Sequence, residues 1–205
     1  MTAHDKVQQF KAEVQSKIET LLNEFANGKV SREQFQALYT HQSLKLQLAE
    51  EAIRADNDGM IDGSQGQTIS IRQSHMGKAI GLMIYHNKTG MFVDTLGAFN
   101  VPSAHIAPIL NDFSMLMDAN RPIDRQVVKV GEKQWLLFAA GRFTTVVTLF
   151  QNEPSSEQSR EIERLHYDFE MANGKLLAGS HMDKSKLAYP FTVFIQQKLS
   201  PRRND

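Results

Sequence analysis

The order of the apolar segments in residues 79–177 constrains the fold of this chain more than any other feature. Two strand-like runs joined by a glycine-containing turn come first. One helical run, three more strand-like runs and a long amphipathic helix follow. When a chain has several strands and few helices, the strands form one sheet and the helices pack on its faces. The sequence therefore predicts an α+β fold with a mixed or antiparallel five-stranded sheet and helices on its faces.

The boundaries of these core elements follow from periodicity and from turn residues. The last two strands show little polar alternation, which is typical of strands covered on both faces. Pro108 fits only in the first turn of a helix, so the first core helix begins near His105. Ser155 and Gln158 form a capping box that opens the final helix. The predicted strands span residues 79–86, 91–96, 125–130, 133–140 and 143–150.

A helical hairpin over residues 1–54 precedes the core as an N-terminal arm. Apolar residues of its first helix recur at spacings of three and four, which indicates one helix face. Asn27 and Gly28 end this helix, and a capping box of Ser31 and Gln34 opens the second. An uncovered apolar stripe would aggregate, so we expect the rest of the chain or a second subunit to cover it.

Residues 55–78 form the predicted linker between arm and core, because glycine and aspartate turn residues dominate their first half. Within the linker, residues 68–71 alternate like a short strand, with a helix as the alternative. The core spans residues 79–178. In residues 179–205, apolar residues alternate with period two around Pro190, which predicts an edge strand followed by a tail. These apolar residues are Leu187, Tyr189, Phe191, Val193 and Ile195.

Composition restricts the classes of function. The chain has 205 residues, with 23 Lys plus Arg and 23 Asp plus Glu, so no net field favours nucleic acid or an anionic membrane. It has no cysteine, which excludes disulfides, thiol catalysis and thiolate metal sites. No window approaches the roughly 20 apolar residues of a membrane span. We expect a cytoplasmic protein that binds no nucleic acid and has no membrane span.

No motif indicates catalysis or a cofactor. The segment 56–62 resembles the middle of an EF-hand loop, but alignment on Gly59 places Arg54 and Gln65 where the anchoring carboxylates belong. We interpret it as an ordinary linker without a metal. Walker, Rossmann and serine-elbow signatures are absent. The expectation is a protein that is not an enzyme and holds no cofactor.

The histidines and the acidic residues of the final helix favour structural roles. No two histidines have the spacing of a local metal pair, and we interpret His86 and His166 as surface or hydrogen-bonded residues. The carboxylates of the final helix alternate with arginines, which is typical of a solvated face. They are Glu157, Glu161, Glu163, Asp168 and Glu170.

The segment order resembles that of roadblock and longin domains in the profilin-like group, and more loosely that of GAF and PAS sensor domains. The residues that carry the resemblance are the hairpin of 79–86 and 91–96, the helix of 106–117, the strands ending at Val130, Ala140 and Phe150, and the cap at Ser155. The resemblance implies a profilin-like sheet and, as in roadblock-like proteins, a non-catalytic dimer that binds or regulates a small GTPase. The arm, the linker and the C-terminal strand depart from a minimal roadblock unit.

Two sets of candidate site residues follow from this resemblance. The first is a dimer or partner interface on the 106–117 helix and the 125–130 strand, formed by Ile106, Ile109, Phe113, Met117 and Val128. The alternative is a GAF- or PAS-like small-ligand sensor, with a pocket lined by Met83, Tyr85, Trp135 and Phe138. We therefore expect a homodimeric interaction module with a protein partner such as a small GTPase, and a ligand sensor as the alternative.

Overall fold

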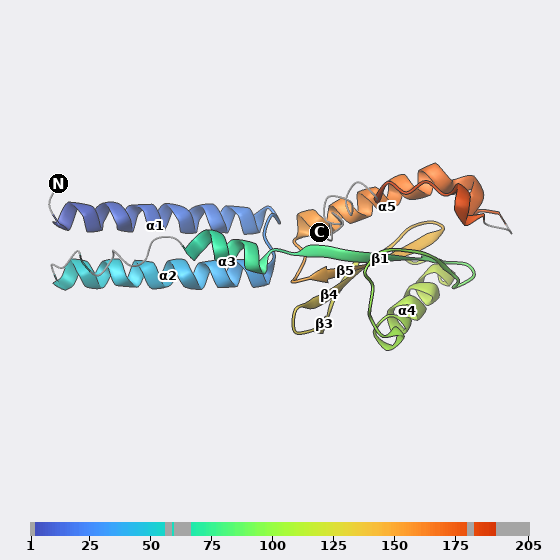
Figure 1. Cartoon of the computed structure of the whole chain (residues 1–205), viewed down its shortest axis with the longest axis horizontal. Helices are drawn as coiled ribbons and strands as arrows, with labels where there is room; N and C mark the ends of the chain where they lie inside the picture. Colours follow the sequence, from blue (N-terminus) through green and yellow to red (C-terminus); the bar gives the residue numbers. More distant parts are fainter. Residues whose placement is uncertain (1–2, 56–58, 60–66, 180–182, 192–205) are drawn as a thin grey trace, which may run out of the picture. The chain divides into compact units, whose positions relative to one another are not determined.

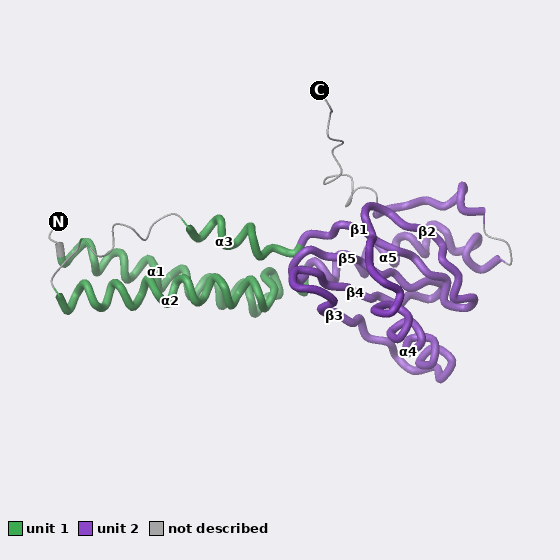
Figure 2. The backbone as a smooth tube through the Cα atoms, turned by 60° about the horizontal axis from the view of Figure 1, so that its bottom comes forward, with its two compact units in different colours: residues 1–77, 155–157 green, residues 78–154, 158–205 purple. Residues whose placement is uncertain are grey.

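The computed structural model describes residues 3–55, 59, 67–179 and 183–191. The chain divides into two compact units (Figure 2). The arm unit consists of Met1–Gly77 together with Ser155–Glu157, and the sheet unit consists of Lys78–Pro154 and Gln158–Asp205. The EF-hand-like segment 56–62 lies outside the described residues except for Gly59.

The arm unit begins with the predicted helical hairpin, formed by α1 (Ala3–Ala26) and α2 (Arg32–Ala55) (Figure 1). Gly28 takes a φ of 73° after α1, and the backbone N–H of Gln34 donates to Ser31 Oγ at 3.2 Å, as a helix cap requires. The apolar stripe of α1 is buried against α2, so this chain itself supplies the cover. The residues in this contact include Val7, Phe10, Val14, Ala49 and Ala52.

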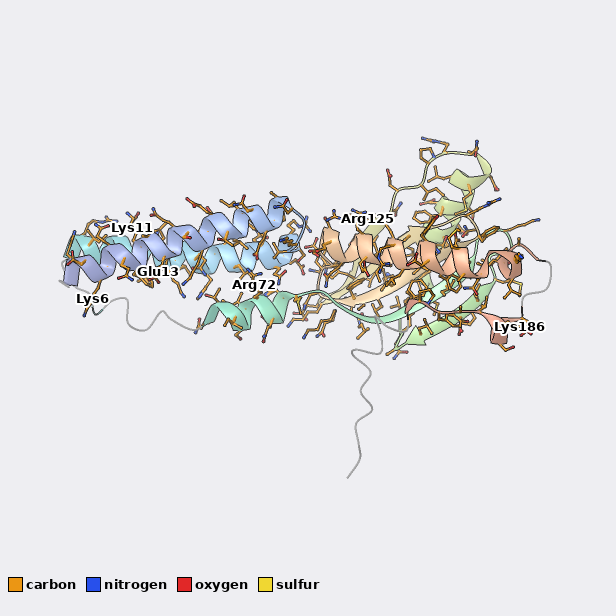
Figure 3. All side chains as sticks on the ribbon, turned by 90° about the horizontal axis from the view of Figure 1, so that it is seen from above. Lys6, Lys11, Glu13, Arg72, Arg125 and Lys186 are labelled. Atoms are coloured by element: carbon orange, nitrogen blue, oxygen red, sulfur yellow. The ribbon has the colours of Figure 1, made fainter. Side chains whose placement is uncertain are left out.

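The predicted linker contains a third helix, α3 (Gln67–His75), so the strand interpretation of residues 68–71 was wrong. Side-chain contacts with the helical hairpin stabilise α3 as a helix. Arg72 of α3 forms a two-pronged ion pair with Glu24 of α1, with a shortest N–O distance of 2.6 Å (Arg72 is labelled in Figure 3). Gln34 Nε2 of α2 donates to the Arg72 carbonyl oxygen at 2.8 Å.

The sheet unit contains five antiparallel strands in the order β2-β1-β5-β4-β3, which confirms the α+β prediction (Figure 1). Each strand begins and ends within one or two residues of its predicted bounds. Glycine and polar turn residues limited the possible ends, which is why these bounds were predictable. The strands are β1 (Lys78–His86), β2 (Phe92–Gly97), β3 (Gln126–Gly131), β4 (Gln134–Ala140) and β5 (Thr144–Gln151).

A helix covers each face of this sheet. α4 (Ala107–Asp118) follows the short 3-10 helix Ser103–His105 and covers one face, while α5 (Ser156–Leu177) covers the other. Consecutive residues of β4 point to opposite faces, so Leu136 packs in the cluster below α4 and Leu137 in the cluster below α5. The low polar alternation of β4 and β5 thus reflects burial on both sides.

The C-terminal segment corrects one prediction, because residues 183–191 contain no strand. After the 3-10 helix Lys184–Lys186, the chain runs along α5, where the side-chain amide of Asn173 donates to the Ala188 carbonyl at 2.7 Å and accepts from the Ala188 N–H at 2.8 Å. Leu187 and Phe191 are buried in the α5-side core. The period-two pattern therefore marks residues that pack on the α5-side core without strand pairing. Val193 and Ile195 lie outside the described residues.

Candidate interaction groove beside the last helix

The turn between β4 and β5 is fastened to α5 by one buried carboxylate. Glu170 is 9% exposed and accepts backbone N–H bonds from Arg142 at 2.8 Å, Phe143 at 2.8 Å and Thr144 at 2.7 Å. The Thr144 hydroxyl donates a fourth bond to Glu170 at 2.8 Å. Four donors aimed at one carboxylate compensate the burial of its charge. The turn is consequently held in one position on α5.

His166 extends this network by one helical turn. It is 3% exposed, and its Nε2 lies 2.8 Å from Thr144 Oγ1 and 3.7 Å from Glu170 Oε1. Because the Thr144 hydroxyl gives its only proton to Glu170, His166 Nε2 must carry a proton and donate to that hydroxyl. Burial lowers the pKa of His166 to about 4, against the opposing effect of the Glu170 carboxylate. At neutral pH the imidazole is therefore uncharged.

Glu170 was wrongly assigned to a solvated helix face. Glu161 and Asp168 do lie on an exposed face of α5, where Arg164 bonds Glu161 at 2.7 Å and Asp168 at 3.0 Å. His166 and Glu170 are one turn apart and flank the apolar stripe that includes Phe169. The sequence did contain a sign that Glu170 is buried. This carboxylate lies beside the apolar stripe of the helix, and a tight turn earlier in the chain can supply N–H donors to it. The separation of more than 20 residues between Glu170 and its donors concealed it.

A groove with a volume of about 640 Å³ lies between α5 and this turn. Its rim carries two exposed side chains one helical turn apart, Tyr167 at 64% and Met171 at 67% exposure. Two cations, Arg142 and Lys175, also line it, and the Arg142 guanidinium lies 5.0 Å from the Phe143 ring centroid. The groove is apolar with positive groups at its edge.

A salt bridge fixes another side chain of the same groove. Glu163 of α5 contributes to the lining, and its carboxylate bonds Arg125, the residue before β3, at 2.8 Å (Arg125 is labelled in Figure 3). This pairing offsets the charge of Glu163. The exposed cations Arg142 and Lys175 then share the groove with one further carboxylate, Glu170, which is buried and hydrogen-bonded to the turn.

The predicted dimer interface is covered within the sheet unit. Ile106 and Phe113 are 3% and 1% exposed, and all five predicted residues belong to the core between α4 and the sheet. Phe113 meets Phe138 edge to face at 6.3 Å between ring centroids. The helical periodicity located the apolar face of α4 correctly, but that face packs on its own sheet. Ile109, Met117 and Val128 are the partly buried members.

The four residues of the predicted ligand pocket do not share one cavity. Trp135 packs on the α5 side of the sheet and Phe138 on the α4 side, because they are an odd number of residues apart on one strand. Tyr85 donates its hydroxyl to Met83 Sδ at 2.8 Å. Tyr85 also lines a cavity of about 280 Å³ below α4. Of the four residues predicted for a sensor pocket, Tyr85 is therefore the one that lines this cavity, whose volume is smaller than that of the groove beside α5.

His86 lies in a saturated polar cluster at the β1–β2 turn. Its Nε2 is 3.0 Å from the Leu177 carbonyl oxygen, and its Nδ1 accepts from the Thr89 N–H at 3.3 Å. Both His86 and His166 are thus hydrogen-bonded, as predicted. In the described part of the chain, no three His, Asp or Glu side chains are placed to hold a metal ion.

Comparison with the models of known protein families and with curated proteins finds no match to this chain. Among the helices described, none is both long enough and apolar enough to cross a membrane.

Proposed function

We propose that the sheet unit is a non-catalytic interaction module that binds a protein partner through the groove beside α5. The observation that carries this proposal is the exposure of Tyr167 and Met171 at the rim of the groove. Tyrosine, methionine and arginine are the residue types enriched in the centres of protein interfaces. In this groove all three occur together, with Arg142 as the third.

Preorganisation supports the same proposal. The Glu170 carboxylate holds the turn of Arg142 and Phe143 on α5, so these side chains need little ordering when a partner arrives. Lower ordering costs leave more of the interaction free energy for affinity. The pairing of Glu163 with Arg125 leaves Arg142 and Lys175 to attract acidic groups of the partner.

The roadblock resemblance supplies the partner class, a small GTPase, and the oligomeric state, a homodimer. The antiparallel sheet with helices on both faces fits a profilin-like arrangement, from which this part of the proposal starts. Because the α4 residues are covered, we place the dimer contact on β3, an edge strand whose Val127 is 37% exposed. A second β3 strand would continue the sheet across the two copies.

Affinity measurements on a recovered partner test the groove. The full chain is used as bait in a native extract, the recovered protein is purified, and its affinity is measured for the wild type and for the Tyr167→Ala/Met171→Ala double variant. We expect the double variant to weaken binding about tenfold or more, as hot-spot truncations do. Met115→Ala is the matched control, because Met115 is 70% exposed on α4, across the sheet. Equal weakening by both variants would contradict the proposal.

A further inference from the structure

A cavity of about 400 Å³ lies within the arm unit, apart from the groove of the proposed function. All three helices of the arm contribute to it. Its lining residues are Phe10, Glu13, Val14 and Lys17 of α1, Lys45 of α2, and Thr68 and Ile69 of α3. The cavity therefore combines an apolar wall with two lysines, one carboxylate and a hydroxyl.

Lys45 is the unusual member of this set. The residue as a whole is 6% exposed, its ammonium nitrogen keeps access to solvent, and that group has no hydrogen bond or ion pair with any described residue. Burial lowers the pKa of Lys45, and the nearby positive charge of Lys17 lowers it further. Lys17 and Lys45 place two like charges on one cavity, and an anion bound between them would offset their repulsion.

The other polar groups around the cavity do not neutralise Lys45. Glu13 is the single carboxylate in the lining; it is exposed and accepts from Gln9 Nε2 at 3.3 Å (Glu13 is labelled in Figure 3). No ion pair with either lysine of the lining is formed by any residue that the structure describes. His41, one turn before Lys45, has a pKa lowered by its burial and by the Lys45 charge.

Donor groups of α3 face the same space. Gln42 Nε2 donates to Thr68 Oγ1 at 3.2 Å, so the Thr68 hydroxyl proton is available to an acceptor in the cavity. Thr68 and Ile69 belong to the first turn of α3, and the N-terminal end of a helix carries a partial positive charge. Two ammonium groups, a hydroxyl and the first turn of α3 thus line the same cavity as the exposed Glu13 carboxylate, while Phe10 and Val14 supply apolar surface.

We infer that this cavity binds a small organic anion, with its carboxylate or phosphate group on Lys45 and Lys17 and its apolar body against Phe10, Val14 and Ile69. The bound anion supplies the counter-charge that Lys45 lacks. The cavity volume is in the range of small-molecule sites. The arm unit is then a ligand-binding element in its own right, whatever the sheet unit binds.

Calorimetric titration of the full chain with octanoate, octyl phosphate and the neutral analogue octanol tests the inference. We expect at least one of the two anions to bind, and octanol to bind at least about tenfold more weakly, because a hydrogen bond to a charged group is lost. The two anionic probes distinguish a carboxylate ligand from a phosphate ligand. If neither binds, or if octanol binds equally well, the inference is overturned.

Variants locate the binding site. Lys45→Met removes the charge and keeps the side-chain length, so we expect a folded protein by circular dichroism and at least about tenfold weaker anion binding. Lys45→Arg retains the charge and should retain most of the affinity, which separates lost charge from altered packing. Lys29→Met, an exposed lysine between α1 and α2, is the matched control and should leave binding unchanged. Undiminished binding to Lys45→Met would place the anion elsewhere and refute the site.

Discussion

The contact between Gly141 and Glu170 determines how closely the β4–β5 turn packs on α5. A Cβ atom at Gly141 would lie 2.6 Å from the carboxylate carbon and both oxygens of Glu170. That side chain cannot withdraw, because four donors hold it. Residue choice at this turn is therefore set by a carboxylate almost 30 residues later in the chain.

Gly141→Ala is expected to lower the free energy of unfolding by about 1–3 kcal/mol, the usual cost of overpacking. Urea denaturation of the full chain measures it. Gly174→Ala is the matched control within the same groove, since its Cβ would meet only the Phe143 ring, at 3.9 Å. Alanine also favours the helix interior by up to about 1 kcal/mol, so this control should be neutral or stabilising. A neutral Gly141→Ala would show that Glu170 does not confine the turn.

The buried imidazole of His166 predicts a stability that falls in mild acid. Its pKa is lowered to about 4 in the folded state, against an ordinary value of 6.5 for histidine. Between pH 4 and pH 6.5 the unfolded chain binds more protons at His166 than the folded protein does. The contribution of the uncharged His166 to the free energy of unfolding is therefore complete above about pH 6.5 and is lost as the pH falls toward 4. The slope is at most about 1.4 kcal/mol per pH unit.

Denaturation at pH 7 and pH 5 measures this effect against a His166→Gln variant. Glutamine can still donate an N–H to Thr144 but does not titrate, so the variant should lose less stability between the two pH values than the wild type. Other carboxylates titrate in both proteins and cancel in the comparison. An identical loss in the two proteins would show that His166 is not responsible.

At the scale of elements, α5 organises the sheet unit on two sides. Glu170 of α5 accepts hydrogen bonds from the β4–β5 turn. Asn173 of α5 forms hydrogen bonds with Ala188 of the C-terminal segment. Tyr189 adds a link from that segment to β2, because its hydroxyl donates to Asp94 Oδ2 at 2.6 Å, and burial together with this bond raises the pKa of Tyr189. Side-chain hydrogen bonds replace the strand pairing that the sequence predicted.

Asn173→Ala is expected to detach residues 183–191 from α5, because it removes both bonds to Ala188. Hydrogen exchange of Leu187 and Ala188 should accelerate, and the docking free energy should fall by about 1–3 kcal/mol, the usual net contribution of two hydrogen bonds. Glu161→Ala on the exposed side of α5 is the control, since a surface ion pair contributes at most about 1 kcal/mol. Unchanged exchange at these amides would mean that apolar packing alone holds the segment.

For the whole molecule, the predictable features were those encoded by local periodicity. The hairpin, the five strands and the two core helices each carry their own pattern of apolar residues and turn residues, and they fold where those patterns are. Features that depend on partners distant in the chain were missed. The helix α3 depends on Glu24 and Gln34, and the burial of Glu170 depends on a turn more than 20 residues earlier. The apolar face of α4 was found, but periodicity does not reveal which surface covers it.

The proposed dimer through β3 makes the last prediction, which concerns the assembly. Light scattering of the eluted full chain should give twice the 23.2 kDa of one chain. An antiparallel pairing of two β3 strands about a two-fold axis brings the edge residues of both copies together. Val127→Lys adds a positive charge to each edge, and like charges on a pairing edge oppose association. This variant should therefore elute as a monomer.

Val127→Thr is the matched control, because threonine keeps β-branching and adds no charge. It should remain dimeric if the edge strands pair, whereas a dimer formed through another surface would survive both substitutions. A wild-type mass of 23.2 kDa at all concentrations would contradict the dimer. The β3 strand would then be an unpaired sheet edge that a charged side chain protects. Lys129 is the residue that would provide this protection, since its ammonium lies over the Trp135 ring at 5.3 Å on that edge, and charged side chains of this kind prevent uncontrolled strand addition.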